Sequence, residues 1–131
     1  MIKLNTILIA GILGGLAVAI GAFGAHGLEA VLESNGRNET FETAVKYHFY
    51  HALALLVIGI WQRKENTTKR LNLAAWMFFV GILIFSGSLY VLSLSGVSWL
   101  GAITPIGGLA FILGWLFVAL SAKDNSNKTH L

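Results

Sequence analysis

The longest uncharged stretch of the chain is residues 71–122, which read LNLAAWMFFVGILIFSGSLYVLSLSGVSWLGAITPIGGLAFILGWLFVALSA. No Asp, Glu, Lys or Arg interrupts these 52 residues, whereas a helix needs only about 20 apolar residues to cross a bilayer. The stretch is therefore long enough for two spans. The segment SLSGVS at residues 93–98 is rich in residues that interrupt helices and marks the turn between them.

Two further uncharged stretches, residues 4–28 and 47–62, precede the long one. The second is short for a span, but it becomes long enough if its helix begins near residue 40 and the Lys46 side chain extends toward the membrane surface. The first is longer than the apolar run of a cleaved signal peptide, so we expect it to be retained. The sequence thus predicts an all-α integral membrane four-helix bundle, with transmembrane helices at about 5–26, 40–62, 71–93 and 101–122.

The sequence also predicts the structure of the segments between and after the spans. Leu28, Val31 and Leu32 share one helical face, which indicates a short amphipathic helix at about residues 28–34 on the outer membrane surface. Residues 1–131 form a single membrane domain in this interpretation. Residues 123–131 are polar and are expected to be a flexible cytoplasmic tail.

The composition agrees with a membrane protein and excludes several other classes. Hydrophobic residues make up 56% of the chain and charged residues 11%, against about 25% charged in an ordinary soluble domain. Cysteine is absent, so no disulfide or thiolate-ligated metal site can form. The net charge is only +3 without a dense basic stripe, so we expect membrane lipids and no nucleic acid as partners.

The distribution of basic residues predicts the orientation of the protein. Seven bases fall on one side of the predicted membrane and two, Arg37 and Lys46, on the other. The seven are Lys3, Arg63, Lys64, Lys69, Arg70, Lys123 and Lys128. Because basic loops stay on the cytoplasmic side, both termini are expected in the cytoplasm.

Small residues recur at helical spacing in the first and fourth spans. The set consists of Gly11, Gly15, Gly21, Ala25, Gly107 and Gly108. Small residues let helix backbones approach closely in lipid, so we expect close helix packing at these positions. The contact at these positions can be between helices of one chain or between copies of the chain in a homo-oligomer, and the sequence does not distinguish the two.

Polar residues gather in the outer half of all four predicted spans, with His48 and His51 near the outer end of the second. The candidates are His26, His48, His51, Ser86, Ser88, Tyr90 and Thr104. Polar groups at membrane depth face inward or toward the interface, so they are expected to line an outer cavity. The outer glutamates Glu29, Glu33, Glu39 and Glu42 would favour a cation or an amine there. Alternatively, these polar groups only satisfy one another and the loop backbone.

No motif of a known catalytic or nucleotide-binding site occurs in the chain. Two histidines three residues apart are a weak metal signal, so no cofactor is expected. The sequence favours a non-enzymatic binding or interaction protein. A small transporter or channel subunit and a metal-binding membrane subunit are the alternatives.

Several motifs resemble one family in their identity and their order. They are GAFGAHGL at 21–28, YH at 47–48 with HALA at 51–54, FSGSLY at 85–90, WLG at 99–101 and ITPIGG at 103–108. Together they are similar to the domain-of-unknown-function 423 family, also called uncharacterised protein family 0382, over about residues 7–120. The resemblance implies a small multi-pass protein of the bacterial plasma membrane, and it implies no activity.

Overall fold

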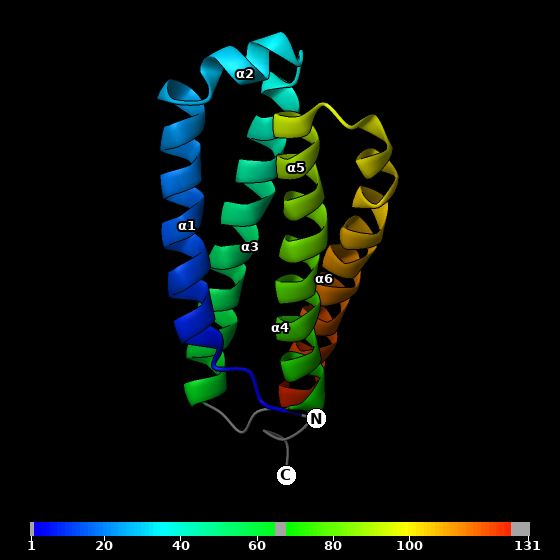
Figure 1. The fold of residues 1–131 in the computed structure, drawn as a ribbon. Coiled ribbons are helices and arrows are strands. Elements are labelled where there is room, and N and C mark those ends of the chain that lie inside the picture. Colours follow the sequence, from blue (N-terminus) through cyan, green and yellow to red (C-terminus); the bar gives the residue numbers. More distant parts are fainter. Residues whose placement is uncertain (1, 65–67, 127–131) are drawn as a thin grey trace.

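The computed structural model describes residues 2–64 and 68–126, and almost all of them are helical. The α-helices are α1 Thr6–His26, α2 Glu29–Ser34, α3 Asn38–Lys64, α4 Lys69–Gly81, α5 Gly87–Ser95 and α6 Thr104–Ser126. A π-helical turn, η1 Ile82–Ser86, joins α4 to α5, and a 3₁₀ turn, η2 Ser98–Ala102, precedes α6. The long helices run side by side, with α2 across one end and the start of α1 at the other (Figure 1).

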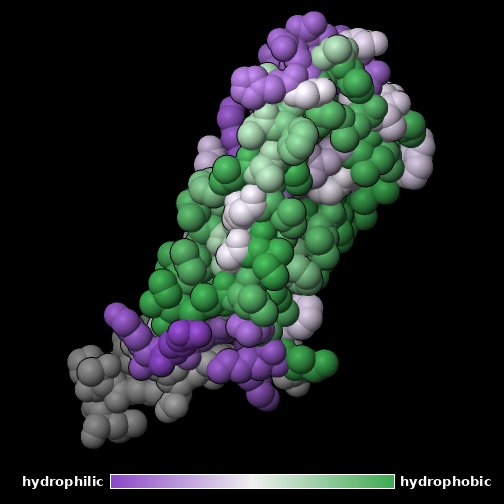
Figure 2. All heavy atoms as spheres, turned by 60° about the vertical axis from the view of Figure 1, so that its left-hand side comes forward, coloured by the Kyte–Doolittle hydropathy of each residue, from purple (hydrophilic) through white to green (hydrophobic). Residues whose placement is uncertain are grey.

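Four of the helical segments are long and apolar enough to cross a membrane, as the sequence predicts. They are Thr6–His26, Asn38–Lys64, Lys69–Ser95 and Ser98–Asp124. A hydrophobic band separates two hydrophilic ends on the surface that Figure 2 shows. We call the end with Glu29, Glu33, Glu39 and Glu42 the acidic end, and the end with Lys3, Arg63, Lys64, Lys69 and Arg70 the basic end. The all-α, four-span fold is thus confirmed.

The bundle consists of two helical hairpins. Helix α1 packs mainly along α3, and α4 packs mainly along α6, while α3 joins the hairpins through contacts with α4, η1 and α5. Phe78, Leu55 and Ile82 are almost completely buried between them. Each hairpin is therefore a close pair of neighbouring spans, and α3 lies at the centre.

Glycines permit the closest approaches within each hairpin. A Cβ atom at Gly107 of α6 would collide with the backbone nitrogen of Phe85 and lie 2.8 Å from its Cα. A Cβ at Gly59 of α3 would lie 2.5 Å from Ile7 Cγ1 of α1. The contacts at Gly21 and Gly108 are less close: a Cβ there would lie 3.2 Å and 3.7 Å, respectively, from the nearest side-chain atom.

The first half of α1 departs from the predicted packing. Outside the neighbouring backbone of α1 itself, a Cβ at Gly11 or Gly15 would have no described atom within 4 Å. The prediction of a close intramolecular contact at these two glycines is therefore wrong. They lie on a side of α1 that α3 does not cover, because α1 has only one long neighbour and is mostly exposed to lipid. Ala25 is also exposed. A homo-oligomer through Gly11 and Gly15 stays a prediction.

The third span contains a feature that the sequence does not predict. Its regular helix is interrupted at Ile82–Ser86 by the π-helical turn η1, which accommodates one extra residue and is often found at functional sites. The Ser86 hydroxyl donates a hydrogen bond to the Ala44 carbonyl of α3 at 2.8 Å. The irregular turn therefore lies where the two hairpins meet.

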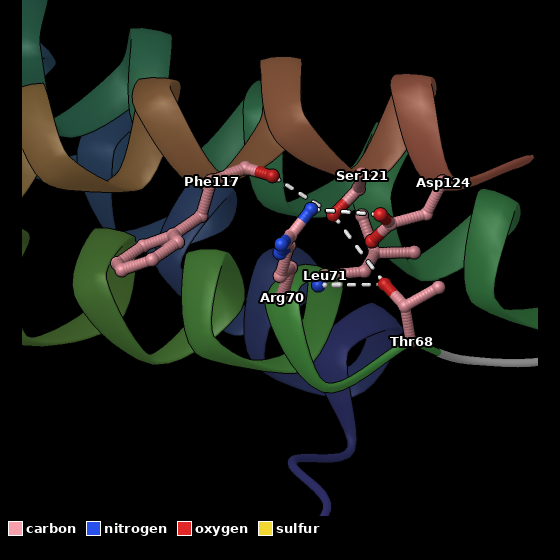
Figure 3. A network of polar contacts seen from close by, with 6 residues as sticks. All are labelled: Thr68, Arg70, Leu71, Phe117, Ser121 and Asp124. Carbon is pink, nitrogen blue, oxygen red and sulfur yellow. Dashed lines mark hydrogen bonds and ion pairs between the residues drawn. The ribbon is translucent and has the colours of Figure 1, made fainter.

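At the basic end, polar contacts fasten α4 to α6 (Figure 3). The Thr68 hydroxyl caps α4 by accepting a hydrogen bond from the Leu71 backbone N–H at 3.1 Å, and it donates to Ser121 Oγ at 3.4 Å. Arg70 and Asp124 form an ion pair at 2.7 Å. Helix α6 thus extends to residue 126, beyond the predicted start of a flexible tail at 123; residues 127–131 lie outside the described part.

Candidate functional site

A cavity of about 450 Å³ lies at the acidic end, among the last turn of α1, the short helix α2 and the first turns of α3. Its polar lining consists of Glu29, Glu33, Asn38, Glu42 and Lys46. Gly21, Gly24, Ala25, Leu32, Phe41 and Val45 complete the wall. The cavity therefore combines carboxylates with an apolar floor.

Local packing fixes the floor of this cavity. Phe41 is buried, and its ring occupies the space where a side chain on Gly24 would lie. A glycine at position 24 is therefore needed for the ring to reach α1. Leu32 of α2 is also buried, so α2 is anchored on the bundle by its apolar face.

Polar contacts hold α2 in place from its far end. The chain reverses at Gly36, which has a φ of +61° that glycine adopts most readily. The Asn35 side-chain amide donates to the carbonyls of Ser93 and Leu94, at 3.0 Å and 3.2 Å. Arg37 donates to Ser98 Oγ at 3.1 Å. The roof of the cavity is thus fastened to the turn after α5.

The charges around the cavity do not cancel. Glu42 and Lys46 lie one helical turn apart with 3.8 Å between carboxylate oxygen and Nζ. Within the described residues, no cation forms an ion pair with Glu29 or Glu33. Two carboxylates on successive turns of α2 therefore leave an uncompensated negative charge at the cavity, which favours a cation.

An apolar groove of about 280 Å³ adjoins the cavity and shares Gly21, Val45 and Lys46 with it. Its other lining residues are Ala17, Val18, Phe49 and Tyr50. Val18 and Tyr50 are more than half exposed at a depth where the surroundings are lipid. The acidic cavity thus has a neighbouring apolar surface along α1 and α3.

The seven polar residues selected from the sequence do not form one cavity. None of them lines the cavity at the acidic end, and four form two side-chain pairs between helices. His48 Nδ1 lies 2.8 Å from Tyr90 Oη, and Ser88 Oγ lies 2.7 Å from Thr104 Oγ1. These pairs join α3 to α5 and α5 to α6, so each holds two helices together.

His48 also interacts with the first span. Its second ring nitrogen, Nε2, is buried and has no partner within hydrogen-bonding geometry among the described residues. The backbone of Leu13 in α1 is nevertheless close enough to interact electrostatically with the imidazole. Tyr90 is half-buried and lines an apolar groove beside Ile20 and Phe23. The His48 ring therefore lies among α1, α3 and α5.

His51 lies deeper than the sequence predicts. It is 13 residues from both Asn38 and Lys64, the ends of α3, which places it about 20 Å from each end at 1.5 Å per residue. The expectation of a position near the outer end is wrong. His51 is also 11 residues from each end of the predicted span 40–62, and extending that span by two residues at both ends leaves its centre at His51. His48 lies one turn nearer the acidic end.

Both nitrogens of His51 have partners. Nδ1 lies 2.7 Å from the Tyr47 carbonyl, and Nε2 accepts a hydrogen bond from Trp115 Nε1 at 3.1 Å. These contacts assign the proton to Nδ1, which donates it to the carbonyl. The imidazole stacks on Phe111, with 3.6 Å between ring centroids and an interplanar angle of 8°. His51 thus joins α3 to α6 at the middle of the membrane.

His26 stands apart from the other histidines, exposed at the end of α1. No group of three or more His, Cys, Asp or Glu side chains in the described ranges is arranged to hold a metal ion. The structure therefore does not bring His26, His48 and His51 together as a metal site.

Sequence reasoning placed the glutamates above the cavity but missed several residues that shape it. Glu29, Glu33 and Glu42 line the wall itself, and Gly24 and Asn35 position its floor and roof. The ring of Phe41 opposite Gly24 could have been anticipated only with the pairing of α1 and α3. Trp115 was missed because a tryptophan in mid-span carries no polar signal in a hydropathy pattern.

Comparison with known proteins identifies relatives over most of the chain. Residues 20–108 match the family described as a protein of unknown function, DUF423. The UPF0382 membrane protein YwdK of Bacillus subtilis is 47% identical over 107 residues, which cover 82% of this chain and 86% of the relative. A UPF0382 membrane protein of Staphylococcus epidermidis is 51% identical, with coverages of 81% and 84%.

The similarity extends to a more distant bacterium. A UPF0382 membrane protein of Haemophilus influenzae is 39% identical over 106 residues, which cover 81% of this chain and 83% of the relative. No solved structure matches the chain. The motifs, the four spans and these relatives agree, and the chain belongs to the DUF423 family of uncharacterised membrane proteins.

Proposed function

We propose that this protein is a non-enzymatic membrane protein that binds a long-chain amphiphile with an ammonium headgroup at its acidic end. The observation that carries the proposal is the 450 Å³ cavity lined by glutamates, which shares part of its wall with an apolar groove along α1 and α3. A headgroup would occupy the cavity, and its alkyl chain would lie along the groove. A pocket of this size is typical of small-molecule sites.

Charge selects the headgroup in this proposal. Glu29 and Glu33 have no ion-pair partner among the described residues, and Glu42 has only the exposed Lys46. An ammonium group can donate hydrogen bonds to these carboxylates, and a charge-assisted bond is stronger than a neutral one. An anionic headgroup of the same size would be repelled.

The binding test uses dodecylamine, dodecanol and dodecanoate, which share a chain length and differ in headgroup charge. Dodecylamine is expected to raise the thermal unfolding midpoint of the purified protein in a neutral detergent, because a ligand stabilises the state that binds it. Glu29→Gln and Glu33→Gln should each weaken dodecylamine binding about fivefold, which corresponds to roughly 1 kcal/mol.

Glu39→Gln is the matched control, because Glu39 is an exposed glutamate of the same end that does not line the cavity. It should leave dodecylamine binding nearly unchanged. Equal stabilisation by all three amphiphiles, or an equal effect of Glu39→Gln, would contradict the proposed site.

We further propose that the acidic end faces outward from the plasma membrane and that the basic end is cytoplasmic, because basic residues concentrate at the latter. Cysteines at Ser34 and Lys123, which are exposed at opposite ends, test this orientation in intact cells. A membrane-impermeant thiol reagent should label Ser34→Cys and spare Lys123→Cys until the cells are opened. The reverse pattern would overturn the proposed orientation.

A further inference from the structure

The basic end contains a second cavity, of about 300 Å³, between the first turn of α1 and the last turns of α3. Six lining residues carry the inference: Lys3, Thr6, Ile7, Gly59, Gln62 and Arg63. The cavity lies at the opposite end of the spans from the glutamates, so the inference is independent of the proposed amine site.

The segment before α1 holds Lys3 at this cavity. The Ile2 carbonyl accepts hydrogen bonds from Asn72 Nδ2 at 3.3 Å and from Trp76 Nε1 at 3.0 Å, both on α4. Leu4 is buried, so the segment is anchored on both sides of Lys3. It runs across the base of the bundle between α1 and α4 (Figure 1), which places a lysine from one element near Arg63 of another.

The cavity has a polar floor that is fixed by packing. Thr6 Oγ1 donates a hydrogen bond to Gln62 Oε1 at 2.7 Å, and both residues are buried. A Cβ on Gly59 would lie 3.1 Å from the Ile7 backbone nitrogen, so the glycine lets the first turn of α1 approach α3. The first N–H groups of a helix lack intrahelical partners. In α1 the Thr6 N–H is bonded to the Leu4 carbonyl at 2.9 Å, and Asn5 makes no side-chain cap for the following N–H groups. This geometry favours an anion.

Among the described residues, no acid forms an ion pair with either of the two bases of the cavity. Arg70 at the same end is paired with Asp124, whereas neither Lys3 nor Arg63 has an ion pair within the part of the chain that the structure describes. Both side chains are exposed, so they can adjust to a ligand. Two cations around a polar floor are complementary to a phosphate group.

We propose that this cavity binds the phosphate of an anionic glycerophospholipid. The cavity is lined by the first turn of α1 and the last turns of α3 at the basic end. Figure 2 shows that the hydrophobic band gives way to hydrophilic residues at the ends of the bundle, which is the level of lipid phosphates in a bilayer. Leu8 and Ile60, next to cavity residues in sequence, are exposed and apolar, and they would contact the acyl chains. A free phosphate would gain nothing from that surface, so the lipid is the occupant.

The test measures retained lipid by native mass spectrometry of the full-length protein in a neutral detergent. Phosphatidylglycerol is titrated into wild type, into Lys3→Gln/Arg63→Gln, and into Lys64→Gln/Lys69→Gln as the matched control. Lys64 and Lys69 are exposed bases of the same end that do not line the cavity. The cavity variant should bind about 30-fold more weakly than wild type, and the control variant should bind within about threefold of wild type.

Two further arms keep the result unambiguous. Lys3→Arg/Arg63→Lys, which keeps both charges, should retain phosphatidylglycerol. If circular dichroism shows that the double glutamine variant is unfolded, the single variants Lys3→Gln and Arg63→Gln replace it, and each should still bind more weakly than wild type. Phosphatidylcholine and inorganic phosphate should not compete. Equal weakening in the control variant, equal retention of phosphatidylcholine, or displacement by millimolar phosphate would overturn the proposal.

Discussion

Gly107→Ala is expected to lower the free energy of unfolding by about 2 kcal/mol, because overpacking a tight contact costs roughly 1–3 kcal/mol. The added Cβ would collide with the Phe85 backbone, and a backbone cannot rotate away as a side chain can. Phe85 is part of η1, so α6 would have to move away from the π-helical turn. Thermal or denaturant unfolding in a neutral detergent measures the loss.

Gly108→Ala provides a control on the adjacent residue. Its Cβ would lie 3.7 Å from Phe85 Cδ2, which is an ordinary van der Waals distance. Alanine favours a helix over glycine by about 1 kcal/mol, so this variant should be unchanged or slightly more stable. If the two variants lose stability equally, the close approach of α6 to η1 is not what holds the second hairpin together.

His51→Ala is expected to be the most damaging of the histidine substitutions. It removes the ring stacked on Phe111 and leaves the Trp115 N–H without its acceptor at mid-membrane. The Tyr47 carbonyl loses the additional bond from Nδ1 but keeps its backbone hydrogen bond within α3. Truncation of a buried ring costs about 3–5 kcal/mol. His26→Ala, at an exposed position, should change stability by less than about 0.5 kcal/mol.

A second variant separates packing from hydrogen bonding. His51→Phe keeps a flat ring against Phe111 but loses both nitrogens, so the remaining cost is that of unpaired polar groups, about 1–3 kcal/mol. Tryptophan fluorescence of the folded variant should also change, because Trp115 Nε1 loses its acceptor. If His51→Ala and His26→Ala are equally stable, His51 does not hold α3 to α6.

The spans were predictable because lipid offers no hydrogen bonds to an exposed backbone, so long uncharged stretches must be helical. The pairing of the helices could not be predicted from the sequence. Gly15 and Gly107 look alike in the sequence, yet one has no neighbour and the other touches Phe85. The difference depends on which face of each helix meets a partner, and a small-residue spacing does not specify that.

The location of the candidate site was predicted better than its lining. The four glutamates indicated the end of the bundle at which the acidic cavity lies. The seven polar residues were expected in one cavity because a hydropathy pattern gives the depth of a residue in the membrane and not the direction in which its side chain points. Ser86 is the last residue of the π-helical turn and Tyr90 lies one helical turn after it, so their directions depend on a turn that the sequence does not predict. His48, Ser88 and Thr104 pair between helices, as the alternative interpretation anticipated.

The division into two hairpins has a consequence for biosynthesis. Each hairpin joins spans that are consecutive in the chain, α1 with α3 and α4–α5 with α6, so each pair can enter the bilayer as a unit while translation continues. The contacts that unite the pairs, Ser86 with Ala44 and His51 with Trp115, involve residues made much later than their partners. Until the last span is synthesised, His51 therefore lacks its Trp115 donor, so the contact between α3 and α6 can form only after the third span has already been made.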